Sequence, residues 1–245
     1  MSLIVLLVGA ALVTAVLSAM AGMGGGTILI ALMFALGMHP ALALPLHAGV
    51  QFASNATRSV AYGAYVHWRA LGLFALTAVP GPFLVAPWVV DADPDWIRLI
   101  LAVFVVFAVW PSWAQRLKIH GRVGLLTAGA IAGVIGPVVG ATGMLVAPFF
   151  LRDDWRKEQI IATLAVAQAG SHLLKIGAFS LNGFDVFERL DLLLPMAGAA
   201  LIGTLIGRRL SGVFSERGFR QAVRAIMIVL ALRLAWTGLA GLFAV

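Results

Sequence analysis

Two sets of polar side chains recur with the same spacing inside apolar segments of the sequence. They are Gln51, Asn55 and Arg58, and 117 residues later Gln168, His172 and Lys175, with Ser54 and Ser171 beside them. Positions i, i+4 and i+7 share one face of a helix, so each set predicts a polar stripe. Within a membrane such a stripe is too costly to turn toward lipid. The stripes therefore predict either hydrogen bonds between helices or the lining of a pathway, and their repetition favours a pathway.

The charges near these stripes favour an anionic ligand. Arg58 and Lys175 each lie about 10 Å along the helix from the glutamine of their set, which would place one cation on either side of the membrane centre. Snorkelling of both cations to the lipid headgroups is the alternative. All ten Asp and Glu residues fall in loops or at segment ends. A polar, positive interior without a countercharge suits an anion, and no His, Asp or Glu cluster has the spacing of metal ligands.

Two glycine-rich breaks, 22–26 and 136–143, are followed by short apolar segments. As helices, these segments (26–38 and 144–151) would be about 20 and 12 Å long, against a hydrocarbon core of about 30 Å. Each is predicted to be the returning arm of a hairpin that turns within the membrane, with fully spanning arms as the alternative. Free N–H groups and the positive end of a helix dipole would then face an anion. The residues at these positions are Gly24, Gly25, Gly26 and Thr27, and Ala141, Thr142 and Gly143.

Composition places these motifs in a helical membrane protein. Of 245 residues, 62% are hydrophobic and 11% charged, whereas soluble domains carry roughly 25% charged residues. The net charge of +7 is attributed to basic cytoplasmic loops rather than to nucleic-acid binding. Segment 3–20 is interpreted as the first membrane segment and not as a signal peptide, because no Lys or Arg precedes it. Small-residue pairs such as Gly203 and Gly207 predict close helix packing.

The breaks and stripes belong to an internal repeat with copies at residues 1–116 and 117–245. Matching loops carry opposite charges: the loop ending at Arg69 corresponds to one with Asp185 and Glu188. Because Lys and Arg mark the cytoplasmic side, the copies are predicted to be inverted, with both termini non-cytoplasmic. Such repeats are typical of transporters with a site at the repeat interface. The predicted elements are hairpins at 3–38 and 123–151 and helices at about 41–62, 70–90, 96–113, 160–181, 190–210 and 222–245.

Two histidines are candidates for proton coupling. His47 and His172 are expected within the membrane, and an imidazole titrates near neutral pH. Hydrogen-bonded packing is the alternative role for each. Arg233 lies deep in the last segment and has no partner in the repeat. The adjacent pair Ser171 and His172 points about 100° apart on a helix, so it does not predict a catalytic dyad, and an intramembrane enzyme is only a remote alternative.

The chain resembles the sulfite exporter TauE/SafE family of membrane permeases over essentially its whole length. The resemblance rests on the break at 21–26, the stripe with Gln51 and Asn55, and the second break at 140–143. It implies export of sulfite or a small C2 or C3 organosulfonate from the bacterial cytoplasm across the inner membrane. We therefore predict an alternating-access carrier that holds this anion between the two hairpin tips. No cofactor is expected, membrane lipid is the surrounding partner, and a homo-oligomer, a passive anion channel and a carrier of another small anion remain open.

Overall fold

The computed structural model describes residues 3–21, 24–109, 119, 121–210 and 216–243. Every regular element in these ranges is a helix, with short 3-10 turns labelled η. The elements are α1 (Leu3–Ala21), α2 (Gly25–Ala35), α3 (Pro40–Tyr62), η1 (Gly63–Tyr65), α4 (Trp68–Ala78), α5 (Pro80–Asp91), α6 (Pro94–Val109), α8 (Gly121–Val139), α9 (Gly143–Val146), η2 (Ala147–Phe150), α10 (Lys157–Ser180), η3 (Val186–Arg189), α11 (Leu190–Leu210) and α12 (Glu216–Phe243).

Six stretches of the described chain are long and apolar enough to cross a membrane. They are Leu3–Met20, Trp68–Asp91, Gly121–Val139, Lys157–Ser180, Val186–Leu210 and Gln221–Phe243. Large apolar side chains on these helices face outward, including Trp88, which is 79% exposed, and Trp236, which is 75% exposed. The chain is therefore an all-helical integral membrane protein. Helix α3 is not among the six because its polar stripe lowers its hydropathy, and much of that stripe is buried inside the protein.

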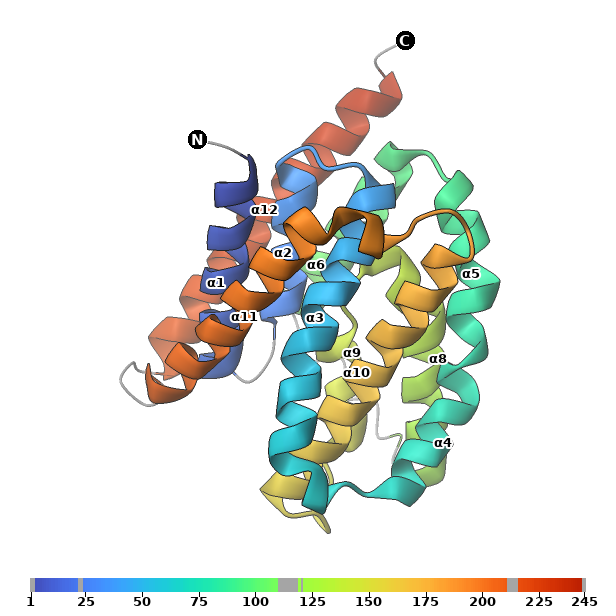
Figure 1. Ribbon diagram of the computed structural model, residues 1–245, viewed down its shortest axis with the longest axis vertical. Coiled ribbons are helices and arrows are strands. Elements are labelled where there is room, and N and C mark those ends of the chain that lie inside the picture. The colour runs from blue at the N-terminus through green and yellow to red at the C-terminus, as the bar shows by residue number, and fades with distance from the viewer. Residues whose placement is uncertain (1–2, 22–23, 110–118, 120, 211–215, 244–245) are drawn as a thin grey trace.

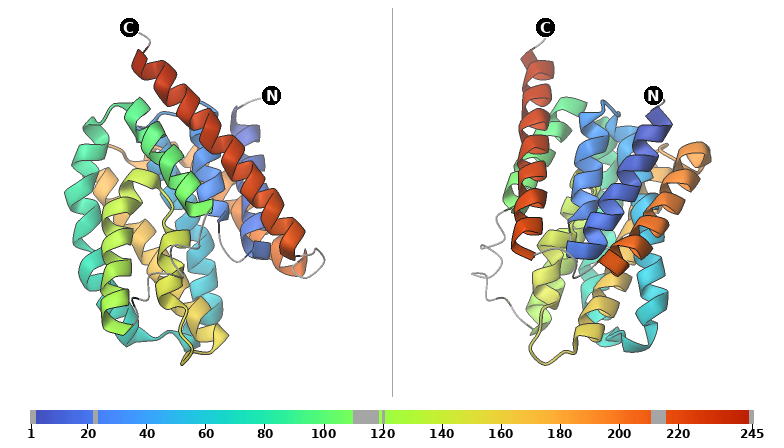
Figure 2. Two further views of the ribbon diagram at one scale, coloured as in Figure 1. Left: turned by 180° about the vertical axis from the view of Figure 1, so that it is seen from behind. Right: turned by 90° about the vertical axis from the view of Figure 1, so that its left-hand side faces the viewer.

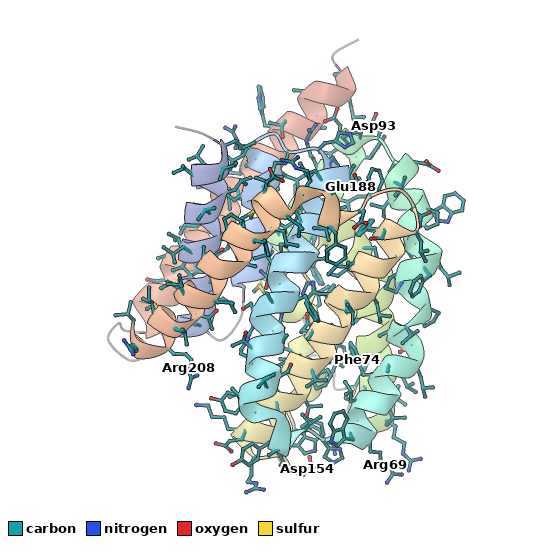
Figure 3. The ribbon with its side chains drawn as sticks, in the orientation of Figure 1. Arg69, Phe74, Asp93, Asp154, Glu188 and Arg208 are labelled. Carbon is teal, nitrogen blue, oxygen red and sulfur yellow. The ribbon has the colours of Figure 1, made fainter. Side chains whose placement is uncertain are left out.

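Most of the helices run roughly along the long axis, with α12 inclined to it, so the molecule has an upper and a lower end (Figures 1 and 2). Helix α1 begins and α2 ends at the upper end, whereas α8 begins and η2 ends at the lower end. Both chain termini lie at the upper end. Figure 3 shows Asp93 and Glu188 at that end, and Arg69, Asp154 and Arg208 toward the other. The two helix pairs that contain the breaks thus enter the bundle from opposite ends.

Two of the predicted elements differ from the structure because of proline. The predicted helix at 70–90 is divided into α4 and α5, since Pro80 has no N–H to continue the hydrogen bonds of α4. The predicted half-helix at 144–151 is one α-helical turn, α9, followed by η2, which contains Pro148. A single turn has little dipole. Gly143 thus begins a helical stretch, as expected, but this stretch is shorter and less regular than the 11-residue α2, so its dipole is weaker.

The returning arms are too short to cross the membrane. Helix α2 has 11 residues, which give a length of about 16 Å, and α9 with η2 is shorter still. Both lengths are below the roughly 30 Å of a hydrocarbon core, and the re-entrant course of the two arms stays a prediction. The predicted copy boundary at 116/117 lies outside the described residues, as do Gly22 and the last residues of the predicted helices at 96–113 and 222–245.

Glycines allow the closest helix contacts, as predicted for Gly203 and Gly207. A Cβ atom on Gly203 would lie 2.4 Å from the carbonyl oxygen of Leu12, and one on Gly207 would lie 2.5 Å from that of Val16. Helix α11 therefore packs against α1 through bare backbone. Arg233, which the sequence left without a role, donates a hydrogen bond from Nε to the carbonyl of Ala35 at 3.0 Å. It thus caps the C-terminal end of α2 with a positive charge.

Candidate functional site

A cavity of about 110 Å³ lies at the centre of the bundle, where the two breaks and the two polar stripes meet. We call it the central cavity. About 10–15 Å³ of such space accommodates one water molecule, so the cavity has room for several waters or for a small polyatomic anion. Its polar or backbone-lined surface comes from Ser18, Gly24, Gly26, Thr27, Gln51, Asn55, Arg58, Ala141, Gly143, Gln168 and His172, and Met144, Ile161, Leu164 and Ala165 complete it.

The first break reaches this cavity through its left-handed glycine. Gly24 has φ 100°, a conformation that favours glycine, and it precedes the first turn of α2. No side chain of the described residues caps this helix end, and the first N–H groups of a helix have no partner within it. Gly24, Gly26 and Thr27 line the cavity. Peptide donors and the positive end of α2 are therefore available to a ligand there.

Gly25 has a different role from its two neighbours. A Cβ atom on Gly25 would lie 2.2 Å from the carbonyl oxygen of Thr14 and 2.4 Å from Cβ of Ser18. Gly25 is therefore the contact that lets α2 fold back onto α1, while Gly24 and Gly26 face the cavity. The first break thus packs α2 against α1 through Gly25 and lines the cavity through Gly24 and Gly26.

The glutamine of each stripe lies against the break of its own half. A Cβ atom on Gly26 would be 3.0 Å from Nε2 of Gln51, and one on Gly143 would be 4.0 Å from Oε1 of Gln168. The offset of 117 residues relates both glycines and both glutamines. Nε2 of Gln168 is buried and has no hydrogen-bond partner among the described residues. One amide donor is therefore left free beside the cavity.

The second break also turns on a left-handed glycine, Gly140, with φ 75°. The carbonyl oxygen of Gly140 accepts a hydrogen bond from Nζ of Lys175. Lys175 is only 2% exposed and is not part of the cavity lining. Its ammonium group therefore bonds to the backbone of the second break, outside the cavity lining. It does not snorkel toward the headgroups. Thr142 is 1% exposed and also lies outside the lining, whereas Ala141 and Gly143 belong to it.

His47 connects the two breaks. Its Nε2 is 2.9 Å from the carbonyl oxygen of Gly26, so the ring N–H donates a hydrogen bond to the first break. A Cβ atom on Gly140 would lie 3.3 Å from Nδ1 of the same ring. The imidazole of His172 packs against it edge to face, with ring centroids 5.8 Å apart. Nδ1 of both rings is buried without a partner among the described residues. His172 lines the cavity, and His47 lies behind it.

Arg58 is the cation that faces the cavity. Its Nη2 donates to Oδ1 of Asn55 at 2.8 Å, and Nδ2 of Asn55 donates to the carbonyl of Gln51 at 2.8 Å. Nε of Arg58 is buried and unpartnered among the described residues. The two cations therefore occupy different settings, because Arg58 lines the cavity and Lys175 is bound to backbone. This difference was not predicted from the repeat.

The two serines of the stripes are engaged elsewhere. Oγ of Ser54 lies 3.4 Å from Oγ1 of Thr204 on α11. Oγ of Ser171 donates to the carbonyl of Ala167 at 2.8 Å on its own helix. Neither serine lines the cavity. Conversely, Ser18 and Met144 do line it, and neither was predicted, because neither belongs to a repeated polar spacing.

The electrostatic character of the cavity follows from its lining. The lining includes the guanidinium of Arg58, the imidazole of His172, and three carboxamides, those of Gln51, Asn55 and Gln168. None of the described lining residues is Asp or Glu. Among the described residues no group of three His, Cys, Asp or Glu lies together as metal ligands would. Donors and positive charge without a countercharge are suited to an anion.

The fold and the cavity define a class, an all-helical integral membrane protein with a polar chamber at the meeting point of its helix breaks. A family model described as "Sulfite exporter TauE/SafE" matches residues 7–234 of this chain. The chain therefore belongs to the sulfite exporter TauE/SafE family of membrane permeases. No curated protein and no solved structure matches the chain. The family consists of transporters, which is consistent with the assignment from sequence that the protein is not an enzyme.

Proposed function

We propose that this protein is a secondary transporter that exports a small sulfur-containing anion, sulfite or a C2 or C3 organosulfonate, across the bacterial inner membrane. The observation that carries the proposal is the central cavity itself. It has room for a small polyatomic anion and is lined by amide, imidazole and guanidinium groups without a carboxylate in the described lining. Membership in the family supports a sulfur compound as the substrate.

The anion would bind between the two breaks. The first turn of α2, with Gly24, Gly26 and Thr27, would donate peptide N–H groups, and Gln51 and Gln168 would donate from their carboxamides. Arg58 would compensate the negative charge, with Asn55 orienting its guanidinium group. These donors would replace the hydration shell that the anion loses on entering the membrane, since hydrogen bonds to a charged group contribute about 1.5–3 kcal/mol each. Ala141 and Gly143 form the opposite wall.

We further propose that the two halves are inverted repeats and that their breaks are the tips of re-entrant hairpins. The opposite directions of α1–α2 and α8–η2 support this arrangement. In inverted-repeat transporters, one half rocks against the other around a central site. Alternating access would therefore expose the central cavity first to one end and then to the other. The basic lower end would face the cytoplasm, and both termini the other side.

His47 and His172 are proposed as the coupling element if protons accompany the anion. They meet across the contact between α3 and α10, one from each half. A proton on either ring would place a positive charge beside the single hydrogen bond that joins His47 to Gly26 of the first break. The membrane potential would also drive an anion outward, by about 2.3 kcal/mol per charge per 100 mV.

Exchange across proteoliposomes tests the proposal. Vesicles containing the purified protein and unlabelled sulfite are diluted into labelled sulfite, and uptake of label is followed. A carrier gives saturable uptake that depends on internal sulfite, and a passive channel gives uptake that does not depend on it. Absence of uptake for sulfite, sulfoacetate and sulfolactate alike would contradict a sulfur-anion substrate.

A further inference from the structure

A second cavity, of about 160 Å³, lies at the lower end of the molecule. It is enclosed by the first turns of α4 and α8 and by the segment between η2 and α10. We call it the lower cavity. Its charged and aromatic lining consists of His67, Arg69, Arg122, Arg152, Asp154 and Trp155. Figure 3 shows Arg69 and Asp154 together at this end. None of these residues lines the central cavity.

One wall of the lower cavity is ordered and close to neutral. Nε and Nη2 of Arg152 donate to the two carboxylate oxygens of Asp154 at 2.9 and 2.8 Å. These hydrogen bonds hold the pKa of Asp154 below its ordinary value, so the carboxylate stays ionised and offsets the charge of Arg152. The Arg152 guanidinium lies 5.3 Å from the centre of the Trp155 ring, which in turn stacks on His67 at 4.8 Å.

The opposite wall carries two positive charges that nothing offsets. Within the part of the chain that the structure describes, neither Arg69 nor Arg122 forms an ion pair or a hydrogen bond. Their helices are held in register at close range, because a Cβ atom on Gly129 of α8 would lie 2.1 Å from the carbonyl oxygen of Phe74 on α4. The two helices therefore present two exposed arginines to the same cavity, each without an ion-pair partner among the described residues.

The position of this cavity coincides with a boundary of the apolar surface. Arg69 and Arg122 each stand at the second residue of a membrane-spanning stretch, Trp68–Asp91 and Gly121–Val139. The adjoining side chains are apolar and exposed, with Trp68 at 68% and Val123 at 63%. Tryptophan concentrates where the hydrocarbon core meets the headgroups. In a bilayer, this boundary would place the lower cavity at the depth of the lipid phosphates.

We propose that the lower cavity binds the phosphate group of an anionic phospholipid, with Arg69 and Arg122 as its ligands. Basic pockets between membrane-spanning helices are a known setting for anionic headgroups. The planar guanidinium fork matches a phosphate oxygen pair. The acyl chains would lie along the exposed apolar side chains that follow each arginine. Inorganic phosphate shares the headgroup chemistry, but the boundary position favours the lipid.

Retention of lipid by the purified full chain tests this proposal. The protein is equilibrated with equal amounts of phosphatidylglycerol and phosphatidylcholine in detergent micelles, and bound lipid is counted by native mass spectrometry. We expect phosphatidylglycerol to be retained at least tenfold in preference. The double variant R69Q/R122Q is expected to lose this preference. The matched variant R208Q/R209Q removes two exposed arginines from the last turn of α11, outside the lower cavity, and is expected to keep the preference.

Three outcomes would overturn the proposal. They are equal retention of the two lipids by the unmodified protein, loss of preference in R208Q/R209Q to the same degree, and full displacement of the lipid by millimolar inorganic phosphate. The last result would assign the cavity to a soluble oxyanion. The comparison of lipids on the unmodified protein and the displacement by phosphate need no variant, so they decide the question even if R69Q/R122Q folds poorly.

Discussion

The side chain of Gln51 lies directly against the backbone of Gly26, so closely that a Cβ atom on the glycine would come within 3.0 Å of Nε2. The glycine belongs to the first break and the glutamine to the middle of α3. The carboxamide therefore lies beside the first turn of α2, where peptide N–H groups face the central cavity. A single methyl group at this point would move the amide.

This contact predicts different effects for the same substitution in the two breaks. Gly26→Ala is expected to displace the Gln51 amide and to weaken sulfite binding by about tenfold, equivalent to about 1.4 kcal/mol. Gly143→Ala occupies the corresponding position in the second half, where the added Cβ would sit 4.0 Å from Gln168 in ordinary contact. It is expected to change binding less than threefold. Calorimetric titration with sulfite measures both constants, and equal losses in the two variants would contradict the close contact.

The two glutamines are expected to provide much of the binding energy. Replacing Gln51 or Gln168 by Leu removes one hydrogen bond from a carboxamide to the charged anion, which contributes about 1.5–3 kcal/mol. Each variant should therefore bind sulfite about 10- to 100-fold more weakly. Thr57→Ala is the matched control, because Thr57 is an exposed residue of α3 whose hydroxyl bonds only to the carbonyl of Ala53. Unchanged affinity in both glutamine variants, with the fold retained by circular dichroism, would remove these residues from the site.

His47 is expected to matter for both stability and transport. His47→Leu removes the hydrogen bond that the partly buried carbonyl of Gly26 accepts from the ring, which costs about 0.5–1.5 kcal/mol. The free energy of unfolding in mixed micelles should fall by that amount, and exchange of sulfite should slow because the first break loses its support. His39→Asn is the control, since His39 is exposed at the start of α3 and only accepts a hydrogen bond from the backbone N–H of Ala41. Stability equal to that of the unmodified protein would contradict the connecting role of His47.

Proton coupling gives a separate prediction for His172. If the pair His47 and His172 carries protons, sulfite flux will acidify or alkalinise the vesicle interior, and His172→Gln will abolish that pH change while sulfite still binds. A pH-sensitive dye trapped in the proteoliposomes reports the proton movement. An identical dye signal from the variant and from the unmodified protein would exclude His172 as the coupling residue.

Close packing between α1 and α11 predicts a stability difference within one helix. Gly203→Ala places a Cβ atom 2.4 Å from the carbonyl oxygen of Leu12, whereas Gly198→Ala meets no atom within 4 Å. Overpacking of this kind costs about 1–3 kcal/mol. Thermal unfolding in detergent should therefore show a lower midpoint for Gly203→Ala and no decrease for Gly198→Ala. Equal midpoints would indicate that α1 is free to move away from α11.

The all-helical membrane fold could be predicted because apolar run lengths and glycine positions are local properties of the sequence. The prediction of an all-helical membrane protein is confirmed, and the close packing at Gly203 and Gly207 is observed. Repeated spacing also identified residues that the structure gathers around one cavity, among them Gln51 and Gln168. Whether they bind a ligand remains a prediction.

What could not be predicted depends on contacts between distant segments. Lys175 and Arg58 occupy equivalent positions of the repeat, yet only Arg58 faces the cavity, because the carbonyl of Gly140 engages Lys175. Spacing within one helix contains no information on such a partner. Similarly, Gly25 differs in role from its neighbours Gly24 and Gly26, because it packs against Thr14 of another helix. The repeat in the sequence therefore predicted a more symmetric site than the structure has.

The most direct test of the central claim is the location of the bound anion. Selenite has the geometry and charge of sulfite, and its selenium atom is identified by anomalous scattering from crystals of the protein grown with it. We expect one anomalous peak in the central cavity, within hydrogen-bonding distance of the carboxamides of Gln51 and Gln168 and of the first turn of α2. A peak at another place, with the central cavity free of selenium at saturating selenite, would contradict the claim.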